Sequence, residues 1–258
     1  MKRIFCIAAA LLLAGAAVMI PVSRTTAAGQ QHTCPPAPAP GSSVNGGLLV
    51  TGPCTLSNVT VNGGATVTST GHLELENNST VHGGVTVQPG GELDLGHTIG
   101  SNTDTFTPNT IDGGIDSTKA SDIDLDNATV NGSVDITGPN GSSSSLFICG
   151  STLHGSVTIT GINGNFGPSE IGDPGEPSQT GPVADCPANS FDGGLTVTGS
   201  RLIEIESNTI HGSVSINSTM LYELAGNTIT GSASCTGSTT FTDGDHTANN
   251  VNGSDTCP

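Results

Sequence analysis

The sequence predicts an all-β protein folded as one right-handed, single-stranded parallel β-helix, a solenoid of about nine to ten coils with a period of about 19 residues. Three observations lead to this fold class. A short glycine-containing motif recurs along the chain, each copy carries short alternating strands, and large aromatic residues are scarce. The 258 residues include 37 Gly, six Phe, one Tyr and no Trp, a composition that suits a narrow core of thin stacked layers.

The repeated motif places a hydrophobic and a polar residue before a Gly-Gly or Gly-Ser turn, and an alternating apolar segment after it. Its copies cover Val61–Val67, Val81–Val87, Ile111–Ile115, Val130–Ile136, Leu153–Ile159, Phe191–Val197, Ile210–Ile216, Ile229–Cys235 and Val251–Ser254, with a partial copy at Asn45–Leu48. The first glycines of successive copies are separated by 17, 20, 30, 19, 23, 38, 19, 19 and 22 residues. The spacing therefore indicates a period of about 19 residues with two longer intervals.

Each copy contains strands of three to five residues in which apolar and polar residues alternate. In one coil, Ile203 and Ile205 alternate with Glu204 and Glu206, and Gly or Asn marks the corners. Period-two alternation predicts strands with one buried face, and stacked coils bury that face against their neighbours. No helical pattern follows the first 28 residues, and the six-residue periodicity of left-handed solenoids is absent, so a right-handed helix is expected.

The chain divides into a leader, a short N-terminal segment and the solenoid. Residues 1–28 combine a basic start, an apolar stretch and small residues before Gly29, as in a secretory signal peptide, so we expect an exported protein with no membrane segment after cleavage. Residues 29–44 are rich in proline. We expect the solenoid to occupy 45–258, with insertions near 96–108 and 161–187 in the two long intervals; the second interval could also hold two coils, and we choose one coil with an insertion.

Charge restricts the classes of partner. Without residues 1–28 the chain has two basic residues, Lys119 and Arg201, against 22 acidic ones, a net charge of −20. Such a surface repels nucleic acid and anionic lipid, and it attracts cations. A solubilising surface for an exported protein is the simplest interpretation of this charge.

Six cysteines remain after the leader, an even number that predicts three disulfides in an oxidising compartment. Aligned on the glycine turns, they fall in three matching pairs on adjacent coils, where stacked strands lie about 4.8 Å apart. The predicted pairs are Cys34–Cys54, Cys149–Cys186 and Cys235–Cys257. The second pair requires residues 161–185 to be looped out, and the absence of a CxxC pair argues against a zinc site.

The repeated Asn-x-(Val/Ile)-x-Gly-(Gly/Ser)-Val-x-(Val/Ile) units cover residues 45–255. In these units the chain resembles bacterial secreted proteins of the right-handed parallel β-helix repeat type. The resemblance implies an architecture and does not identify a function. The calcium-binding nonapeptide pattern of toxin-type β-rolls is missing.

Unrolling the coils gives three outward columns, of which the first directly precedes the glycine turn. Its members are polar: Asn62, His82, Asp112, Asn131, His154, Asp192, His211, Thr230 and Asn252. His82, Asp112, His154, Asp192 and His211 are candidate binding residues, because stacked His and Asp side chains can bind a transition metal. The alternative is that corner positions favour small polar residues for local hydrogen bonds.

The second column is acidic and the third is rich in threonine. The acidic column contains Glu74, Glu76, Asp94, Asp122, Asp124, Asp126, Glu204, Glu206 and Glu223, interrupted by Phe147. Stacked like charges repel, and hard oxygen ligands suit Ca²⁺, so Asp122, Asp124, Asp126, Glu204 and Glu206 are candidate calcium ligands; the alternative is a solubilising face. The third column pairs residues such as Thr158-x-Thr160 and Thr196-x-Thr198, which looks like the ice-binding face of some β-solenoid antifreeze proteins, although Asp116, Asp135, Gln88 and Asn217 break it.

Two classes of function stay open. Polysaccharide lyases with this fold are similar to one another in using Arg or Lys as base, and here only Lys119 and Arg201 exist, in different coils. A sugar cleft usually has aromatic platforms, which this chain lacks, whereas pairs of carboxylates are too common to be diagnostic. The sequence favours a non-catalytic, extracellular structural or binding protein with cell-envelope polysaccharide or Ca²⁺ as partner. A carbohydrate-active β-helix enzyme is the alternative, and ice binding a lesser one.

Overall fold

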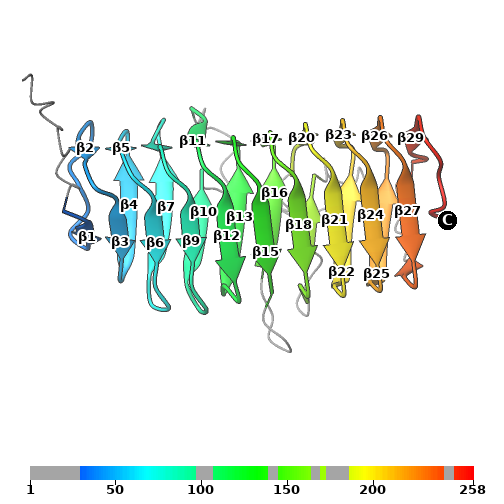
Figure 1. Ribbon diagram of the computed structural model, residues 1–258, viewed down its shortest axis with the longest axis horizontal. Helices are drawn as coiled ribbons and strands as arrows, with labels where there is room; N and C mark the ends of the chain where they lie inside the picture. Colours follow the sequence, from blue (N-terminus) through cyan, green and yellow to red (C-terminus); the bar gives the residue numbers. More distant parts are fainter. Residues whose placement is uncertain (1–29, 97–106, 139–144, 164–168, 173–185, 241–246) are drawn as a thin grey trace, which may run out of the picture.

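The computed structural model describes residues 30–96, 107–138, 145–163, 169–172, 186–240 and 247–258. Within these ranges the chain forms short strands and no helix, so nothing described is a helix long and apolar enough to cross a membrane. The strands build three parallel sheets that run side by side along one elongated shaft (Figure 1). The predicted parallel β-solenoid is confirmed, whereas the expected signal peptide of residues 1–28 lies outside the described residues.

Every coil contributes one strand to each sheet. Sheet A contains β1 (His32–Cys34), β3 (Leu48–Val50), β6 (Ala65–Val67), β9 (Val85–Val87), β12 (Ile115–Thr118), β15 (Val134–Thr137), β18 (Val157–Thr160), β21 (Leu195–Thr198), β24 (Val214–Asn217) and β27 (Ala233–Thr236). Sheet B contains β2 (Ser43–Val44), β5 (Thr60–Val61), β8 (Thr80–Val81), β11 (Asn109–Ile111), β14 (Ala128–Val130), β17 (Thr152–Leu153), β20 (Ser190–Phe191), β23 (Thr209–Ile210), β26 (Thr228–Ile229) and β29 (Asn250–Val251). Sheet C contains β4 (Pro53–Ser57), β7 (His72–Glu76), β10 (Glu92–Leu95), β13 (Asp122–Asp126), β16 (Ser145–Cys149), β19 (Ser169–Ile171), β22 (Arg201–Glu206), β25 (Met220–Ala225) and β28 (Thr239–Thr240).

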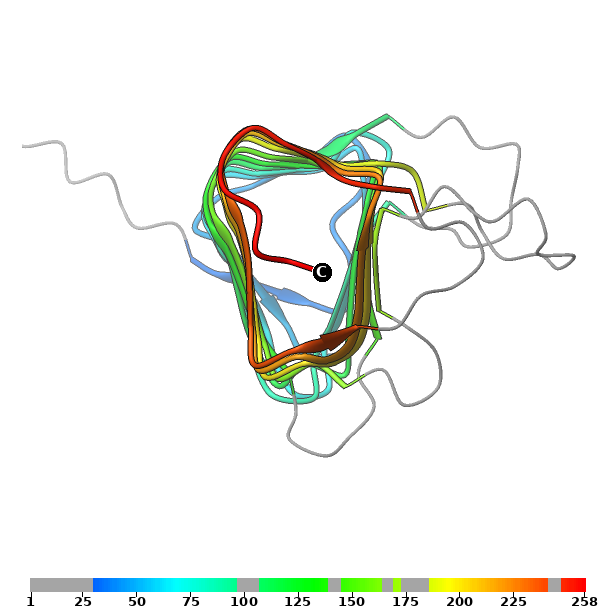
Figure 2. The same ribbon diagram turned by 90° about the vertical axis from the view of Figure 1, so that its right-hand side faces the viewer.

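The path of the chain makes the solenoid right-handed. Viewed from the C-terminal end, the three sheets form a triangular outline, and residues 247–258 pass along the top, turn the corner and descend on the left (Figure 2). The chain therefore turns anticlockwise as it advances toward the viewer. Register partners such as Thr60 and Thr80 are 20 residues apart, and Ser190 and Thr209 are 19 apart, close to the predicted period.

The core consists of stacked columns of aliphatic side chains. Alternation along each strand turns every second residue inward, and the parallel register places it on the equivalent residue of the next coil. One column on sheet B shows this for the whole shaft: Val44, Val61, Val81, Ile111, Val130, Leu153, Phe191, Ile210 and Ile229, all at most 7% exposed. No coil can bury its inner face alone, so stability comes from each neighbouring pair of coils.

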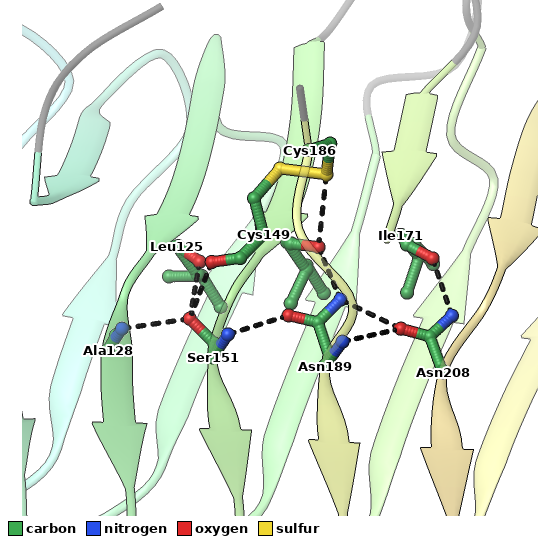
Figure 3. Close-up of a disulfide and its surroundings, with 9 residues drawn as sticks. Leu125, Ala128, Cys149, Ser151, Ile171, Cys186, Asn189 and Asn208 are labelled. Atoms are coloured by element: carbon green, nitrogen blue, oxygen red, sulfur yellow. Dashed lines mark hydrogen bonds between the residues drawn. A yellow bond between two sulfur atoms is a disulfide. The ribbon is translucent and has the colours of Figure 1, made fainter. Parts of the chain in front are cut away.

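A buried ladder of polar side chains lines the corner between sheets C and B (Figure 3). The Oδ1 atom of Asn189 accepts a hydrogen bond from the backbone N–H of Ser151 at 2.8 Å, and the Oδ1 of Asn208 accepts one from the N–H of Asn189 at 2.9 Å. The side-chain amide of Asn208 in turn donates to the carbonyl of Ile171 at 2.6 Å. Ser79, Asn109, Asn227 and Asn249 extend the ladder. These side chains satisfy backbone groups that the corner withdraws from the sheets.

The first glycine of each turn is required by the close approach of neighbouring coils. A Cβ atom on Gly113 would lie 2.4 Å from the backbone nitrogen of Gly84, and one on Gly83 would lie 2.5 Å from that of Gly64. Backbone cannot move aside at these contacts without separating the coils. The repeated glycine that defines the sequence period is therefore a steric requirement of coil stacking.

Both long intervals between glycines are single coils. Gly113 donates a backbone hydrogen bond to Gly83 across the first interval, and β18 pairs with β21 across the second. The region 161–187 differs from the continuous insertion that the sequence suggested, because β19 lies inside it and occupies one strand position of sheet C. Three residues are too short for alternation to be recognisable. Residues 97–106, 164–168 and 173–185 of the two expected insertions lie outside the described residues.

The solenoid also starts earlier than expected, because β1 and β2 come from the proline-rich segment 29–44. The disulfide prediction is confirmed for all three pairs: Cys34–Cys54, Cys149–Cys186 and Cys235–Cys257. The pair Cys149–Cys186 joins the coil of β16 to the following coil beside the polar ladder (Figure 3). Alignment on the glycine turns was sufficient because disulfides need the short Cα separation that adjacent coils provide.

We predict that Asn208→Ala destabilises the protein strongly. The substitution leaves the buried N–H of Asn189 and the carbonyl of Ile171 without these partners, which costs about 2–5 kcal/mol of unfolding free energy. Chemical denaturation measures the loss. The control is Asn252→Ala at an exposed corner, where a change below about 0.5 kcal/mol is expected. Equal effects of the two substitutions would show that the ladder does not stabilise the fold.

Candidate functional site

The three predicted columns lie on three different sides of the shaft. The polar corner column follows the strands of sheet B, the acidic column lies on sheet C, and the threonine-rich column lies on sheet A. In each, residues from successive coils are neighbours because the parallel register has no slip between them. Each side can therefore be examined as a row of side chains about 4.8 Å apart.

The corner column contains a hydrogen-bonded group centred on Asp112. The Nδ1 atom of His82 lies 2.6 Å from Asp112 Oδ2, and the side-chain amide of Asn131 donates to Asp112 Oδ1 at 2.9 Å. The bond to His82 lowers the pKa of Asp112, with the Asn131 bond as a smaller contribution in the same direction. This arrangement orients His82 and leaves its Nε2 atom free of the pair.

A second His–Asp pair repeats the geometry further along the column. The Nδ1 atom of His154 lies 2.5 Å from Asp192 Oδ2, and both side chains are more than two-fifths exposed. His211 follows Asp192 in the next coil, where its N–H donates to the carbonyl of Phe191. The structure therefore brings His154, Asp192 and His211 into one row, and it places His82 and Asp112 in the same row on earlier coils.

The acidic column of sheet C is three residues wide. Its central row, in register across adjacent strands, contains Thr55, Glu74, Asp94, Asp124, Phe147, Glu170, Glu204 and Glu223. Phe147 divides it, as the sequence predicted, into two acidic groups. The predicted calcium ligands do not form one site, because Asp122, Asp124 and Asp126 lie on β13 whereas Glu204 and Glu206 lie three strands away on β22.

Four aspartates meet on β10 and β13. Asp94 is the register partner of Asp124, which lies between Asp122 and Asp126 on its own strand. Burial, then the charges of Asp126 and Asp94, raises the pKa of Asp124 to about 9. Burial, then Glu92 and Asp94, raises the pKa of Asp122 to about 6. The Oδ1 atoms of Asp122 and Asp124 are inaccessible and accept no hydrogen bond, so ionisation here is opposed by both desolvation and repulsion.

The second acidic group is buried although it lies on the outward side of sheet C. Glu204, Glu206 and Glu223 are 7%, 4% and 1% exposed, and Glu204 pairs in register with Glu170 and Glu223. Among the described residues, no group of three or more His, Cys, Asp and Glu side chains is arranged to hold a metal ion. Calcium binding by either acidic group stays a prediction.

The threonine-rich column of sheet A is regular only in its C-terminal half. Thr158 and Thr196 are register partners, as are Thr160 and Thr198, whereas Asp116 and Asp135 replace threonine on the preceding coils. These aspartates line an open depression of about 360 Å³ with Thr86. The interruptions that the sequence indicated are therefore real breaks in the face.

Sequence reasoning missed a more regular row on sheet B. Its outward positions, in unbroken register over ten coils, are Ser43, Thr60, Thr80, Thr110, Thr129, Thr152, Ser190, Thr209, Thr228 and Asn250. The threonine hydroxyls of this row make no hydrogen bond within the described part of the chain. The signal was present, because each repeat has Thr, Ser or Asn three residues before its first glycine. We call this set the sheet B hydroxyl row.

We predict that the aspartates of β10 and β13 make the protein less stable as pH rises. The folded-state pKa of Asp124 is raised above its value of 3.8 in an unfolded chain, so the folded state binds more protons and stability is lost between about pH 4 and pH 9. Asp124→Asn should raise the thermal midpoint by at least about 2 °C at pH 8 and much less at pH 4. Thermal unfolding across this range measures it.

The control for this experiment is Asp116→Asn, which removes an exposed carboxylate from sheet A and leaves sheet C unchanged. A gain for Asp124→Asn that is independent of pH, or equal to that of the control, would contradict the assignment of the effect to the aspartate group.

The geometry of the outer faces thus comprises one row of His–Asp pairs, two acidic groups and two rows of hydroxyl side chains. Of these, the sheet B hydroxyl row extends furthest without interruption. Comparison of the chain with family models, with curated proteins and with solved structures finds no match.

Proposed function

We propose that the protein is a non-catalytic exported binding protein that holds an extended, uncharged polysaccharide along sheet B. The observation that carries this proposal is the sheet B hydroxyl row, a line of polar side chains in register over ten coils. Spacing of about 4.8 Å between coils gives the row a length of about 43 Å, enough to contact several sugar units at once.

The chemistry of the row suits a polymer rich in hydroxyl groups. Each threonine hydroxyl can donate one hydrogen bond and accept two, and none of them is used within the described chain. Beside the row, the polar corner column adds imidazole, carboxylate and amide groups, among them His154 and Asp192. The two rows together offer donors and acceptors on both sides of an extended ligand.

The charge of the molecule favours an uncharged ligand over an anionic one. Sheet C carries two acidic groups, and only two basic residues stand outside the leader, so an anionic polymer would be repelled. The hydroxyl row itself is uncharged. Neutral glycan is therefore the class of polymer that the surface accommodates at the lowest electrostatic cost.

Rigidity and the three disulfides support an extracellular binding role. The row is held by backbone pairing on both sides of nearly every strand, so little conformational entropy is lost when a ligand binds. Many weak contacts along one polymer then act together. Three disulfides are compatible with an oxidising compartment outside the cytoplasm, and export itself rests on the predicted signal peptide.

The proposal predicts that insoluble neutral polysaccharides such as cellulose, chitin or starch sediment the protein. Thr129→Val with Thr152→Val removes two neighbouring hydroxyls of the row while keeping shape and strand propensity, and should weaken binding about 5- to 30-fold. Depletion of protein from solution, measured against polysaccharide concentration, gives the dissociation constants.

The matched control is Thr158→Val with Thr196→Val, the same change on sheet A. Equal weakening by both pairs, or no sedimentation of the starting protein by any neutral polysaccharide, would overturn the proposal. Thermal hysteresis of ice growth, lost in the sheet B variant, would instead assign the hydroxyl row to ice.

A carbohydrate-active enzyme is the second candidate, and the second acidic group favours it. Glu204 and Glu223 are register partners on adjacent strands and are buried, so their carboxyl groups lie at a spacing suited to a glycosidase pair. Catalysis would release reducing ends from polysaccharide, and both Glu204→Gln and Glu223→Gln should abolish that release while leaving sedimentation unchanged. No release by the starting protein contradicts this candidate.

A further inference from the structure

The last residues of the chain lie across the C-terminal end of the shaft. Figure 2 shows the terminal segment leaving the wall and turning toward the centre of the triangular outline. Ala233, the first residue of β27, donates its N–H to the carbonyl of Ser254 at 2.9 Å and accepts from the N–H of Thr256 at 3.0 Å. The disulfide Cys235–Cys257 fixes the same segment to the next inward position of β27.

This segment occupies the backbone positions with which β27 could bind another strand. In a parallel ladder, one residue in two directs both its N–H and its carbonyl to the same neighbour. Ala233 directs these groups to the terminal segment, and Cys235 is linked to that segment covalently. The outer edge of the segment is itself blunted, because the N–H of Cys257 donates to Asp255 Oδ1 and Pro258 has no N–H.

The opposite end of sheet A has no equivalent cover within the described residues. There β1 pairs with β3 and with no other strand. His32 donates its N–H to Gly47 of that coil, so the N–H and carbonyl of Thr33 point to the outer edge. Thr33 is exposed. An open strand edge of this kind is a template for another strand.

The two ends are complementary to one another. Placed on β27 in the register that β27 itself keeps with β24, a second copy's β1 would stack His32, Thr33 and Cys34 on Ala233, Ser234 and Cys235. Small side chains would meet on the inner side, and two hydroxyls would meet on the outer side. The contact would continue the coil-on-coil stacking that already holds every neighbouring pair of coils together.

We propose that residues 254–258 are a disulfide-latched cap that prevents a second copy of this chain from adding its β1 to β27. Opening the Cys235–Cys257 bond releases the cap and permits head-to-tail association of copies along the solenoid axis. A dithiol reductant opens it by thiol–disulfide exchange: two electrons and two protons pass to Cys235 and Cys257, which become thiols, and the dithiol becomes a disulfide.

The test uses variants of the chain without its leader, because a reductant would also open the other two disulfides. Cys235→Ser with Cys257→Ser, and separately a chain ending at Gly253, should form elongated oligomers, whereas the starting protein should be a monomer. Light scattering after size-exclusion chromatography measures the mass, and small-angle X-ray scattering measures the length, which should grow by about one shaft per added copy. The control is Cys149→Ser with Cys186→Ser, which removes a disulfide away from the cap and should stay monomeric.

A change at the other end tests the partner strand. Thr33→Pro removes the outward N–H of β1 without touching its bonds to β3, and proline is tolerated at such an edge. Added to either cap variant, it should restore the monomer. The proposal is overturned if both cap variants remain monomeric, if the starting protein already forms head-to-tail oligomers, or if Thr33→Pro leaves the oligomers unchanged.

Discussion

In-register stacking of one coil on the next is the constraint on which the rest of this structure depends. A single coil has an inner face of only a few aliphatic side chains, and only its neighbours can remove that face from water. Stacking demands that backbones approach closely at the glycine turns, as Gly113 shows against Gly84. It also demands that corners satisfy their own backbone groups, which the ladder through Asn189 and Asn208 achieves inside the shaft. The repeat in the sequence is the record of these two demands.

The same constraint arranges every outer face as rows. A residue type that recurs once per period becomes a line of like side chains, and the consequence depends on its chemistry. Uncharged hydroxyls such as Thr129 and Thr152 can line up without cost and remain free to bind a ligand. Carboxylates such as Asp94 and Asp124 repel one another, and burial then raises the pKa of Asp124 to about 9. Alternating His and Asp relieve the repulsion by pairing, as His154 and Asp192 do.

A stacked shaft leaves open edges at its ends, and the chain treats its two ends differently. At the C-terminal end, the segment containing Asp255 and Cys257 occupies the edge of β27. At the N-terminal end, Cys34–Cys54 joins sheets A and C, while the edge of β1 stays open in the described residues. The binding surface proposed for sheet B and the cap proposed for sheet A lie on different parts of the molecule and can fail or hold independently.

The sequence by itself determined the architecture, because a steric period leaves a trace in every repeat: the glycine turns, the alternation, the three disulfide pairs and the order of coils follow from it. Only the tertiary structure decided which outward residues are neighbours and what surrounds them. Asp122 and Glu204 share a column in the sequence, but three strands and Phe147 separate them. The burial of Glu204 and Glu223, the strand β19 and the hydroxyl row of sheet B came from the structure, since burial and side-chain contacts between coils depend on distances in space that local sequence patterns do not encode.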